Sequence, residues 1–143
     1  MITFINHASF IIEGNGKSIL TDPWYEGEIF NKGWKLLIEN ETKDINNILD
    51  SIDYIWISHE HPDHFSISFF KKYKEKIIDN SIIILFQETK DKRVVNFLRN
   101  LSVNVIEIKE NEEFKVEKNF ALKIIKDEFY DSALIVNINN FII

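Results

Sequence analysis

Three of the four histidines of this chain lie within six positions, in the segment His-Glu-His-Pro-Asp-His at residues 59–64. For this composition, a His-x-His-x-Asp-His pattern arises by chance with a probability of about 2 in 10,000, so a shared chemical role is the better explanation. His59 and His61 are two positions apart, and an extended backbone directs side chains at that spacing to the same side. The spacing therefore predicts two imidazoles that face one point.

Two more donors follow Pro62, which bends the chain. Asp63 and His64 can then re-enter the space that the first two histidines face. Imidazole nitrogen together with carboxylate oxygen suits zinc, iron or manganese. Glu60 is expected to face solvent between the ligands. The predicted metal ligands are His59, His61, Asp63 and His64.

The cluster lies between a predicted strand and a predicted helix. Residues 53–58 contain the apolar run Tyr-Ile-Trp-Ile, which lacks alternation and is typical of a strand covered on both faces. Residues 66–77 place apolar side chains at helical spacing, with Ser66 as the helix cap. The carboxyl end of such a strand is where open α/β sheets place their sites. The alternation continues with a strand at 81–86, a helix at 90–100 and a strand at 103–108.

Alternating strands and helices predict an α/β fold with a largely parallel sheet and right-handed crossovers. The N-terminal region begins instead with antiparallel strands, and the turn Gly14-Asn15-Gly16 between two of them supplies positive φ. Asp22-Pro23-Trp24 ends the third strand, and a loop is expected to about Trp34. The remaining predicted elements are strands at 2–6, 9–13, 18–21, 113–116, 120–125, 133–136 and 141–143 and a helix at 42–51.

The composition is that of one globular domain of 143 residues, with 45% hydrophobic residues and a net charge of −6. Seventeen lysines and arginines against 23 aspartates and glutamates leave no basic excess, so nucleic acid is not an expected partner. No apolar run approaches the roughly 18 residues of a membrane helix, and no signal peptide is recognisable, so a cytoplasmic location without membrane contact is expected. Because the chain has no cysteine, a metal would rely on histidine and carboxylate.

Four segments carry a resemblance to a known family. The segment Ser-His-Glu-His-Pro-Asp-His at residues 58–64 resembles the metal signature of the metallo-β-lactamase superfamily. The chain resembles the lactonase-like branch at Asn-His-Ala-Ser-Phe (residues 6–10) and Leu-Thr-Asp-Pro-Trp (residues 20–24). Phe-Asn-Lys-Gly-Trp at residues 30–34 is similar to the β-lactamase-like domain associated with CMP-sialic-acid hydroxylases. The resemblance implies a metallo-β-lactamase-like αββα sandwich, incomplete at the C-terminus, with residues 1–143 as the N-terminal part of a single domain.

The resemblance also implies a role for each residue of the cluster. Asp22 would orient a ligand histidine, which is the usual way in which an imidazole tautomer is set. His7 would line the pocket beside the metals, and with Asp63 it forms the predicted catalytic pair; the alternative for His7 is a buried histidine bonded to backbone. Trp24 and Trp34 are expected to pack within the fold rather than to hold substrate. The first metal would be held by His59 and His61, and the second by Asp63 and His64.

The chain departs from the family pattern after the signature. Family members supply another histidine on a later strand, then a bridging aspartate and a final histidine, whereas this chain has no histidine after His64. Acidic residues in a turn are usually solvated. An oxygen ligand in place of the first missing histidine would come from Asp127, Glu128 or Asp131. The chain is therefore expected to be part of a longer protein or to have lost part of the site.

The leading hypothesis is a metal-dependent hydrolase that acts on a small molecule. A metal-bound hydroxide would attack an ester, lactone or phosphoester, while Asp63 holds or accepts the proton. Zinc is the expected metal, with iron or manganese as alternatives, and iron-based redox chemistry is a third hypothesis.

The alternative is a catalytically incomplete interaction domain or half-domain that needs a partner chain. It depends on the predicted last strand, Phe141-Ile142-Ile143, which has no polar cap. An exposed apolar edge invites pairing with another chain, so a homodimer or strand exchange through this strand is expected.

Overall fold

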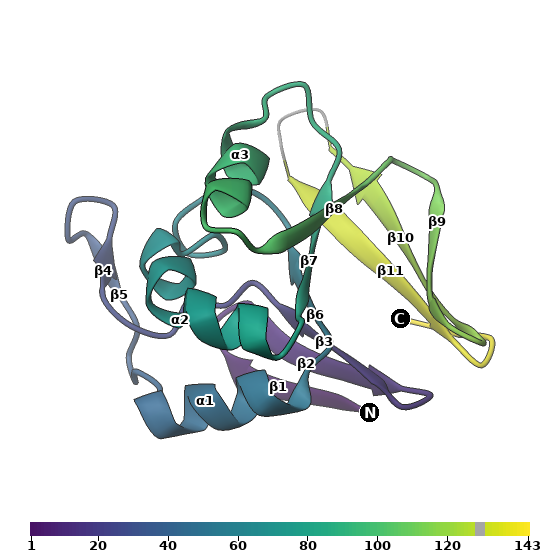
Figure 1. Cartoon of the computed structure of the whole chain (residues 1–143), viewed down its shortest axis with the longest axis horizontal. Coiled ribbons are helices and arrows are strands. Elements are labelled where there is room, and N and C mark those ends of the chain that lie inside the picture. Colours follow the sequence, from purple (N-terminus) through teal and green to yellow (C-terminus); the bar gives the residue numbers. More distant parts are fainter. Residues whose placement is uncertain (128–130) are drawn as a thin grey trace.

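A six-stranded sheet lies at the centre of the structure, a computed structural model that describes residues 1–127 and 131–143 (Figure 1). In sheet order, its strands are β1 (Ile2–Asn6), β2 (Ser9–Gly14), β3 (Lys17–Thr21), β6 (Tyr54–Ile57), β7 (Ile83–Gln87) and β8 (Asn104–Ile108). The first three strands are antiparallel neighbours, and the pairs β3–β6, β6–β7 and β7–β8 are parallel. Asn15 and Gly16 take φ values of 50° and 76° in the turn between β2 and β3, which confirms that predicted hairpin.

The sequence of β6 follows from its place between β3 and β7. Ile55 and Ile57 are buried against the helices, while Trp56 is buried on the opposite face, against a second sheet. Since both faces of the strand are covered, its positions are apolar without alternation. The prediction of a doubly covered strand is confirmed.

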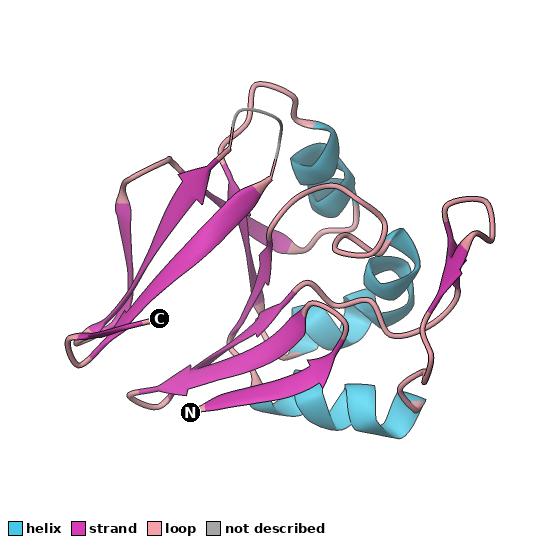
Figure 2. Cartoon of the chain, turned by 180° about the vertical axis from the view of Figure 1, so that it is seen from behind, coloured by secondary structure: helices cyan, strands magenta, loops and turns pink. Residues whose placement is uncertain are grey.

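In the described part of the chain, three helices cover one face of this sheet (Figure 2). They are α1 (Thr42–Ser51), α2 (Ile67–Asp79) and α3 (Arg93–Asn100). The Ser66 hydroxyl caps α2 by accepting a hydrogen bond from the Phe69 backbone N at 3.2 Å, and Phe69, Phe70 and Ile77 form the buried stripe that attaches the helix to the sheet. Among the described residues, no helix combines the length and the apolar character that crossing a membrane requires.

A second, antiparallel sheet covers the other face of the central sheet. In sheet order, its described strands are β12 (Phe141–Ile142), β11 (Ser132–Ile138), β10 (Phe120–Lys126) and β9 (Glu113–Glu117). Phe120, Leu122 and Ile124 alternate along β10 and share one buried cluster with Ile19 and Trp56 of the central sheet. The described residues therefore form helix, sheet and sheet layers of the predicted αββα sandwich, and the fold class is confirmed.

Two segments differ from the predicted elements. Part of the expected loop before Trp34 belongs to a short hairpin of β4 (Glu28–Ile29) and β5 (Trp34–Lys35), because strands of two residues show no periodicity in a sequence. The third helix begins at Arg93 rather than near Lys90. The Asp91 carboxylate accepts a hydrogen bond from the Arg93 backbone N at 2.9 Å, so a turn before the helix satisfies this donor.

Candidate metal centre

The candidate site lies at the carboxyl ends of β3 and β6, which are adjacent parallel strands. Asp22 follows β3 directly, and residues 58–64 follow β6. The turn between β1 and β2 brings in His7, whose φ is 45°. Together these segments bring six residues with predicted roles into one cluster: His7, Asp22, His59, His61, Asp63 and His64.

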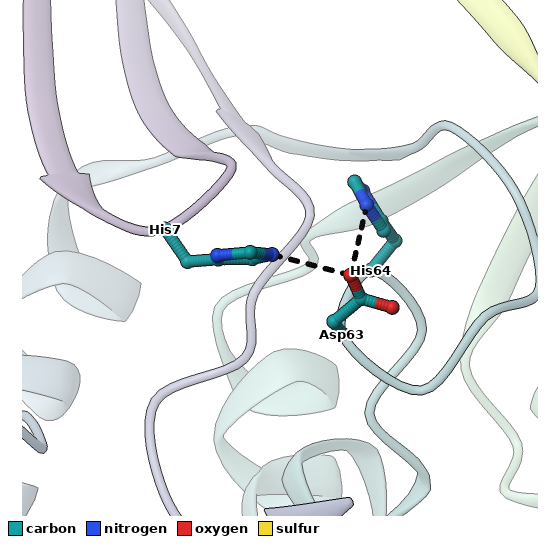
Figure 3. Close-up of side chains that lie close together, drawn as sticks. All are labelled: His7, Asp63 and His64. Carbon is teal, nitrogen blue, oxygen red and sulfur yellow. Dashed lines mark hydrogen bonds and ion pairs between the residues drawn. The ribbon is translucent and has the colours of Figure 1, made fainter. Parts of the chain in front are cut away.

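Three donors converge on one point of this cluster (Figure 3). Asp63 Oδ2 lies 3.2 Å from His7 Nε2 and 3.3 Å from His64 Nε2. One ligand atom from each of these three residues lies within 4.8 Å of the other two. In the described part of the chain, the other carboxylate oxygen, Asp63 Oδ1, is buried without a hydrogen-bond partner. A buried carboxylate with an unsatisfied oxygen is costly without a cation or a proton, so the arrangement fits a metal site.

His59 and His61 form a second pair of donors next to the first group. His59 Nε2 lies 2.9 Å from His61 Nδ1, and the rings of His59 and His64 are in contact, with centroids 4.2 Å apart and a tilt of 39° between their planes. Without a cation, a proton must lie between the two facing nitrogens. With a cation between them, His59 Nε2 and His61 Nδ1 can both offer their lone pairs to it, in agreement with the prediction that the two imidazoles face one point.

The Asp22 carboxylate sets the orientation of the surrounding groups. Its Oδ1 accepts a hydrogen bond from the Ser58 backbone N at 2.7 Å, and its Oδ2 accepts one from the Ser58 hydroxyl at 2.8 Å. Oδ2 also lies 2.9 Å from His64 Nδ1. Because an ionised carboxylate only accepts, His64 carries its proton on Nδ1, and the Nε2 lone pair is left to face Asp63.

The same reasoning determines the tautomer of His59. The Ser58 hydroxyl donates to Asp22, so it accepts from His59 Nδ1, which is 2.9 Å away. Asp131 Oδ1 lies 3.2 Å from the same nitrogen and is a second acceptor for its proton. His59 Nε2 is then free to bind a metal, since a ring nitrogen that ligates must be unprotonated.

The neighbouring imidazoles of His59 and His64 have opposite electrostatic environments. Burial lowers the pKa of His59, and the charge of neighbouring His64 lowers it further. Burial also opposes a charge on His64, but its hydrogen bond to Asp22 and the charges of the nearby carboxylates outweigh burial and raise the pKa of His64. His59 is thus held in the neutral form that a metal requires.

The other residues that the sequence analysis named are placed as follows. Glu60 forms an ion pair with Arg93 at 3.0 Å and takes no part in the cluster. Asp127 accepts a hydrogen bond from the Asp131 backbone N at 3.0 Å. Of the three carboxylates considered in place of the missing histidine, Asp131 contacts the cluster, through the His59 nitrogen opposite the one that faces His61. Glu128 lies outside the described residues.

Trp24 and Trp34 differ in how far they are exposed to solvent. Trp24 is 2% exposed, which confirms its packing role, whereas Trp34 is 52% exposed, so the prediction that it packs within the fold is wrong. Trp34 belongs to the small hairpin and contacts the His7 ring at 5.7 Å between centroids. Sequence reasoning also gave no role to Ser58, although its position directly before the histidine cluster was a usable signal.

Comparison with known proteins identifies the family. Residues 1–129 match the family described as Beta-lactamase superfamily domain. This chain belongs to the β-lactamase superfamily. The predicted family is thereby confirmed.

Three proteins that this chain is similar to are each longer than the chain. The cytidine monophosphate-N-acetylneuraminic acid hydroxylase of Xenopus laevis is 35% identical over 83 residues, which are 58% of this chain and 14% of that hydroxylase. CmlA, a diiron beta-hydroxylase from Streptomyces venezuelae, superposes with a TM-score of 0.68 at 15% identity, over 95% of this chain and 27% of CmlA. A protein of Veillonella parvula described as a possible metal-dependent hydrolase gives a TM-score of 0.68 at 16% identity, over 96% of this chain and 58% of that protein. At such identities the structural likeness is one of fold.

Proposed function

We propose that this chain forms the metal-binding part of a metal-dependent hydrolase that cleaves an ester, lactone or phosphoester of a small molecule. The observation that carries the proposal is the convergence of His7, Asp63 and His64, whose ligand atoms lie within 4.8 Å of one another. Membership of the β-lactamase superfamily agrees with a metal at this place.

The residues that would hold the metal are those with free donor atoms in the cluster. His59 Nε2 and His61 Nδ1 face each other at 2.9 Å, and Asp63 and His64 offer Oδ2 and Nε2 beside them. His7 Nε2, 3.2 Å from Asp63 Oδ2, is near enough to bind the same cation as Asp63. Neutral imidazoles and one carboxylate are a donor set for zinc, which we propose as the metal, with iron or manganese as alternatives.

A bound divalent metal would supply a water whose pKa is lowered towards about 7. The residues of the chain then position and relay the proton. The Asp63 carboxylate would take up the proton that the attacking water releases, through the oxygen that does not bind the metal. His7 Nε2 lies 3.2 Å from the other oxygen of this carboxylate, Asp63 Oδ2. Asp22 and Ser58 keep His64 and His59 in the tautomers that leave the inward nitrogens free.

Metal content tests the proposal. Protein incubated separately with zinc, iron(II) under argon, or manganese, and then desalted, should retain about one equivalent or more of at least one metal by mass spectrometry. Asp63→Asn should lose it, whereas Asp79→Asn, an exposed carboxylate at the end of α2, should retain it. Metal-dependent turnover of bis(p-nitrophenyl) phosphate or a simple lactone that Asp63→Asn abolishes would establish hydrolysis. Wild-type protein that retains no metal would refute the proposal.

A second candidate function is that of an interaction domain completed by another chain. Phe141 and Ile142 form the edge strand β12 and are 76% and 73% exposed, and Ile143 beyond it is 52% exposed. This edge supports pairing with a second copy, through dimerisation or strand exchange. Light scattering after size exclusion should then give a mass above that of one chain, and Ile142→Lys should restore the monomer. A wild-type monomer at high concentration would contradict this candidate.

A further inference from the structure

The hairpin of β4 and β5 carries two half-exposed aromatic rings. Phe30, at its tip, is 49% exposed and Trp34, in β5, is 52% exposed, although Trp24 and Trp56 are 2% and 7% exposed. In Figure 1 the hairpin stands apart from the two large sheets, and its strands pair with each other. Large aromatic side chains that the core does not need are typical of recognition surfaces.

These rings lie beside the candidate metal centre. Trp34 contacts the ring of His7 edge-on, with centroids 5.7 Å apart, and Phe30 contacts the ring of His61 edge-on at 6.5 Å. Phe30 and Trp34 also contact each other at 5.9 Å with a tilt of 55° between their planes. The aromatic pair therefore connects a histidine of the three-donor group with a histidine of the neighbouring pair.

The backbone of the hairpin tip holds Phe30 in place at an energetic cost. Phe30, Asn31 and Lys32 have φ values of 51°, 53° and 66°, a conformation that residues with a Cβ rarely adopt, least of all in succession. The Gly33 backbone N donates a hydrogen bond to the Phe30 carbonyl at 3.0 Å and closes the turn. Strain of this kind is found where a site requires a side chain in a particular place.

We propose that Phe30 and Trp34 form a binding subsite for an apolar ring that the substrate carries next to the bond to be cleaved. This inference rests on the proposed function and extends it to a class of substrate. A ring that lies against the exposed faces of Phe30 and Trp34 would cover them, while the reactive group attached to it reaches the metal ligands beside the hairpin. Burying roughly 55 Å² of ring surface, at about 25 cal/mol per Å², corresponds to about tenfold in affinity.

Two hydroxamates that differ only in this group provide the test. Both chelate divalent metals through the same two oxygens, but benzohydroxamate carries a ring where acetohydroxamate carries a methyl group. On metal-loaded protein, calorimetric titration should show benzohydroxamate binding about tenfold more tightly. In Phe30→Ala/Trp34→Ala the two should bind with nearly equal affinity, while the affinity for acetohydroxamate stays unchanged. Trp34→Phe should keep most of the preference.

A matched control is available in β1, an edge strand of the central sheet. Phe4 is 61% exposed and contacts Phe10 rather than the metal centre, so Phe4→Ala should leave the preference intact. Equal binding of both hydroxamates to the wild type, or a preference that survives in the double variant, would overturn the subsite while the metal site stands. A protein that retains no metal and binds neither compound would overturn the proposed function and this inference with it.

Discussion

Asp22→Asn is expected to weaken metal binding by reversing the tautomer of the His64 imidazole. An asparagine keeps one oxygen, which the Ser58 backbone N–H occupies at 2.7 Å in the wild type. The new amide group then lies where Oδ2 stands, 2.9 Å from His64 Nδ1, and it can only donate. His64 would accept at Nδ1 and carry its proton on Nε2, where it points to Asp63 Oδ2 at 3.3 Å instead of offering a lone pair.

The expected loss of metal affinity can be estimated from residues that orient ligand histidines in other metal sites. Loss of a residue that orients a ligand histidine costs about 10- to 100-fold in metal affinity, which corresponds to roughly 1.4–2.7 kcal/mol. Competition with a chromophoric chelator measures the affinity, and the ¹⁵N chemical shifts of the histidine rings in metal-free protein report the tautomer directly.

The control for Asp22→Asn is a second aspartate that also accepts a backbone N–H. Asp53 precedes β6, at the end of the strand away from the site, and accepts from the Ser18 backbone N at 2.9 Å. Asp53→Asn should leave metal affinity unchanged. If Asp22→Asn binds metal within twofold of the wild type, or if its His64 still carries the proton on Nδ1, the reasoning on orientation is refuted.

Two further variants test contacts that hold the fold together. Partial burial opposes ionisation of Asp53, but hydrogen bonds from Lys17 and the Ser18 backbone outweigh it and lower the pKa of Asp53 below its ordinary value of 3.8. Since the pKa of Asp53 is lower in the folded state than in the unfolded state, this stabilisation is complete at neutral pH and is lost as the pH falls through the folded value. Asp53→Asn should therefore lower the free energy of unfolding by about 0.5–1 kcal/mol at pH 7. Urea titrations at several pH values should show that this difference between the wild type and the variant shrinks in acid. A Cβ at Gly14 would lie 2.8 Å from two side-chain atoms of Ile138 on β11, so Gly14→Ala should destabilise the protein by about 1–2 kcal/mol. Adding Ile138→Val should relieve part of this cost in urea unfolding, and strictly additive effects would show that the two sheets do not press together there.

Much of the fold was predictable because its signals are local. The run at β6 and the amphipathic spacing of α2 are each contained in a short stretch, and both elements lie where the sequence indicates. The small hairpin was missed because two-residue strands leave no pattern, and the start of α3 was misplaced because a side chain, Asp91, satisfies a backbone donor before the helix. Exposure of Trp34 could not be read from residue type, since an aromatic ring suits a core and a binding surface equally.

The candidate site likewise has a part that the sequence predicts and a part that it does not. The spacing of His59 and His61 predicts that their imidazoles face one point, and the structure places His59 Nε2 2.9 Å from His61 Nδ1. The family resemblance, rather than spacing, connected His7 and Asp22 with this cluster. The contact of Asp131 with His59 depends on how the second sheet packs against the first, which the predicted strand at 133–136 does not indicate.

The sequence by itself determined which kinds of donor atom the candidate site offers. Because the chain has histidines and carboxylates but no cysteine, the donor atoms are restricted to nitrogen and oxygen. Most of these donors lie within residues 59–64, where the short spacing makes them converge. Tertiary structure decided which nitrogen of each ring faces the site and which aromatic rings stay exposed beside it. Those properties depend on contacts between residues far apart in the chain, such as Asp22 and Ser58, which meet because β3 and β6 became neighbours in one sheet.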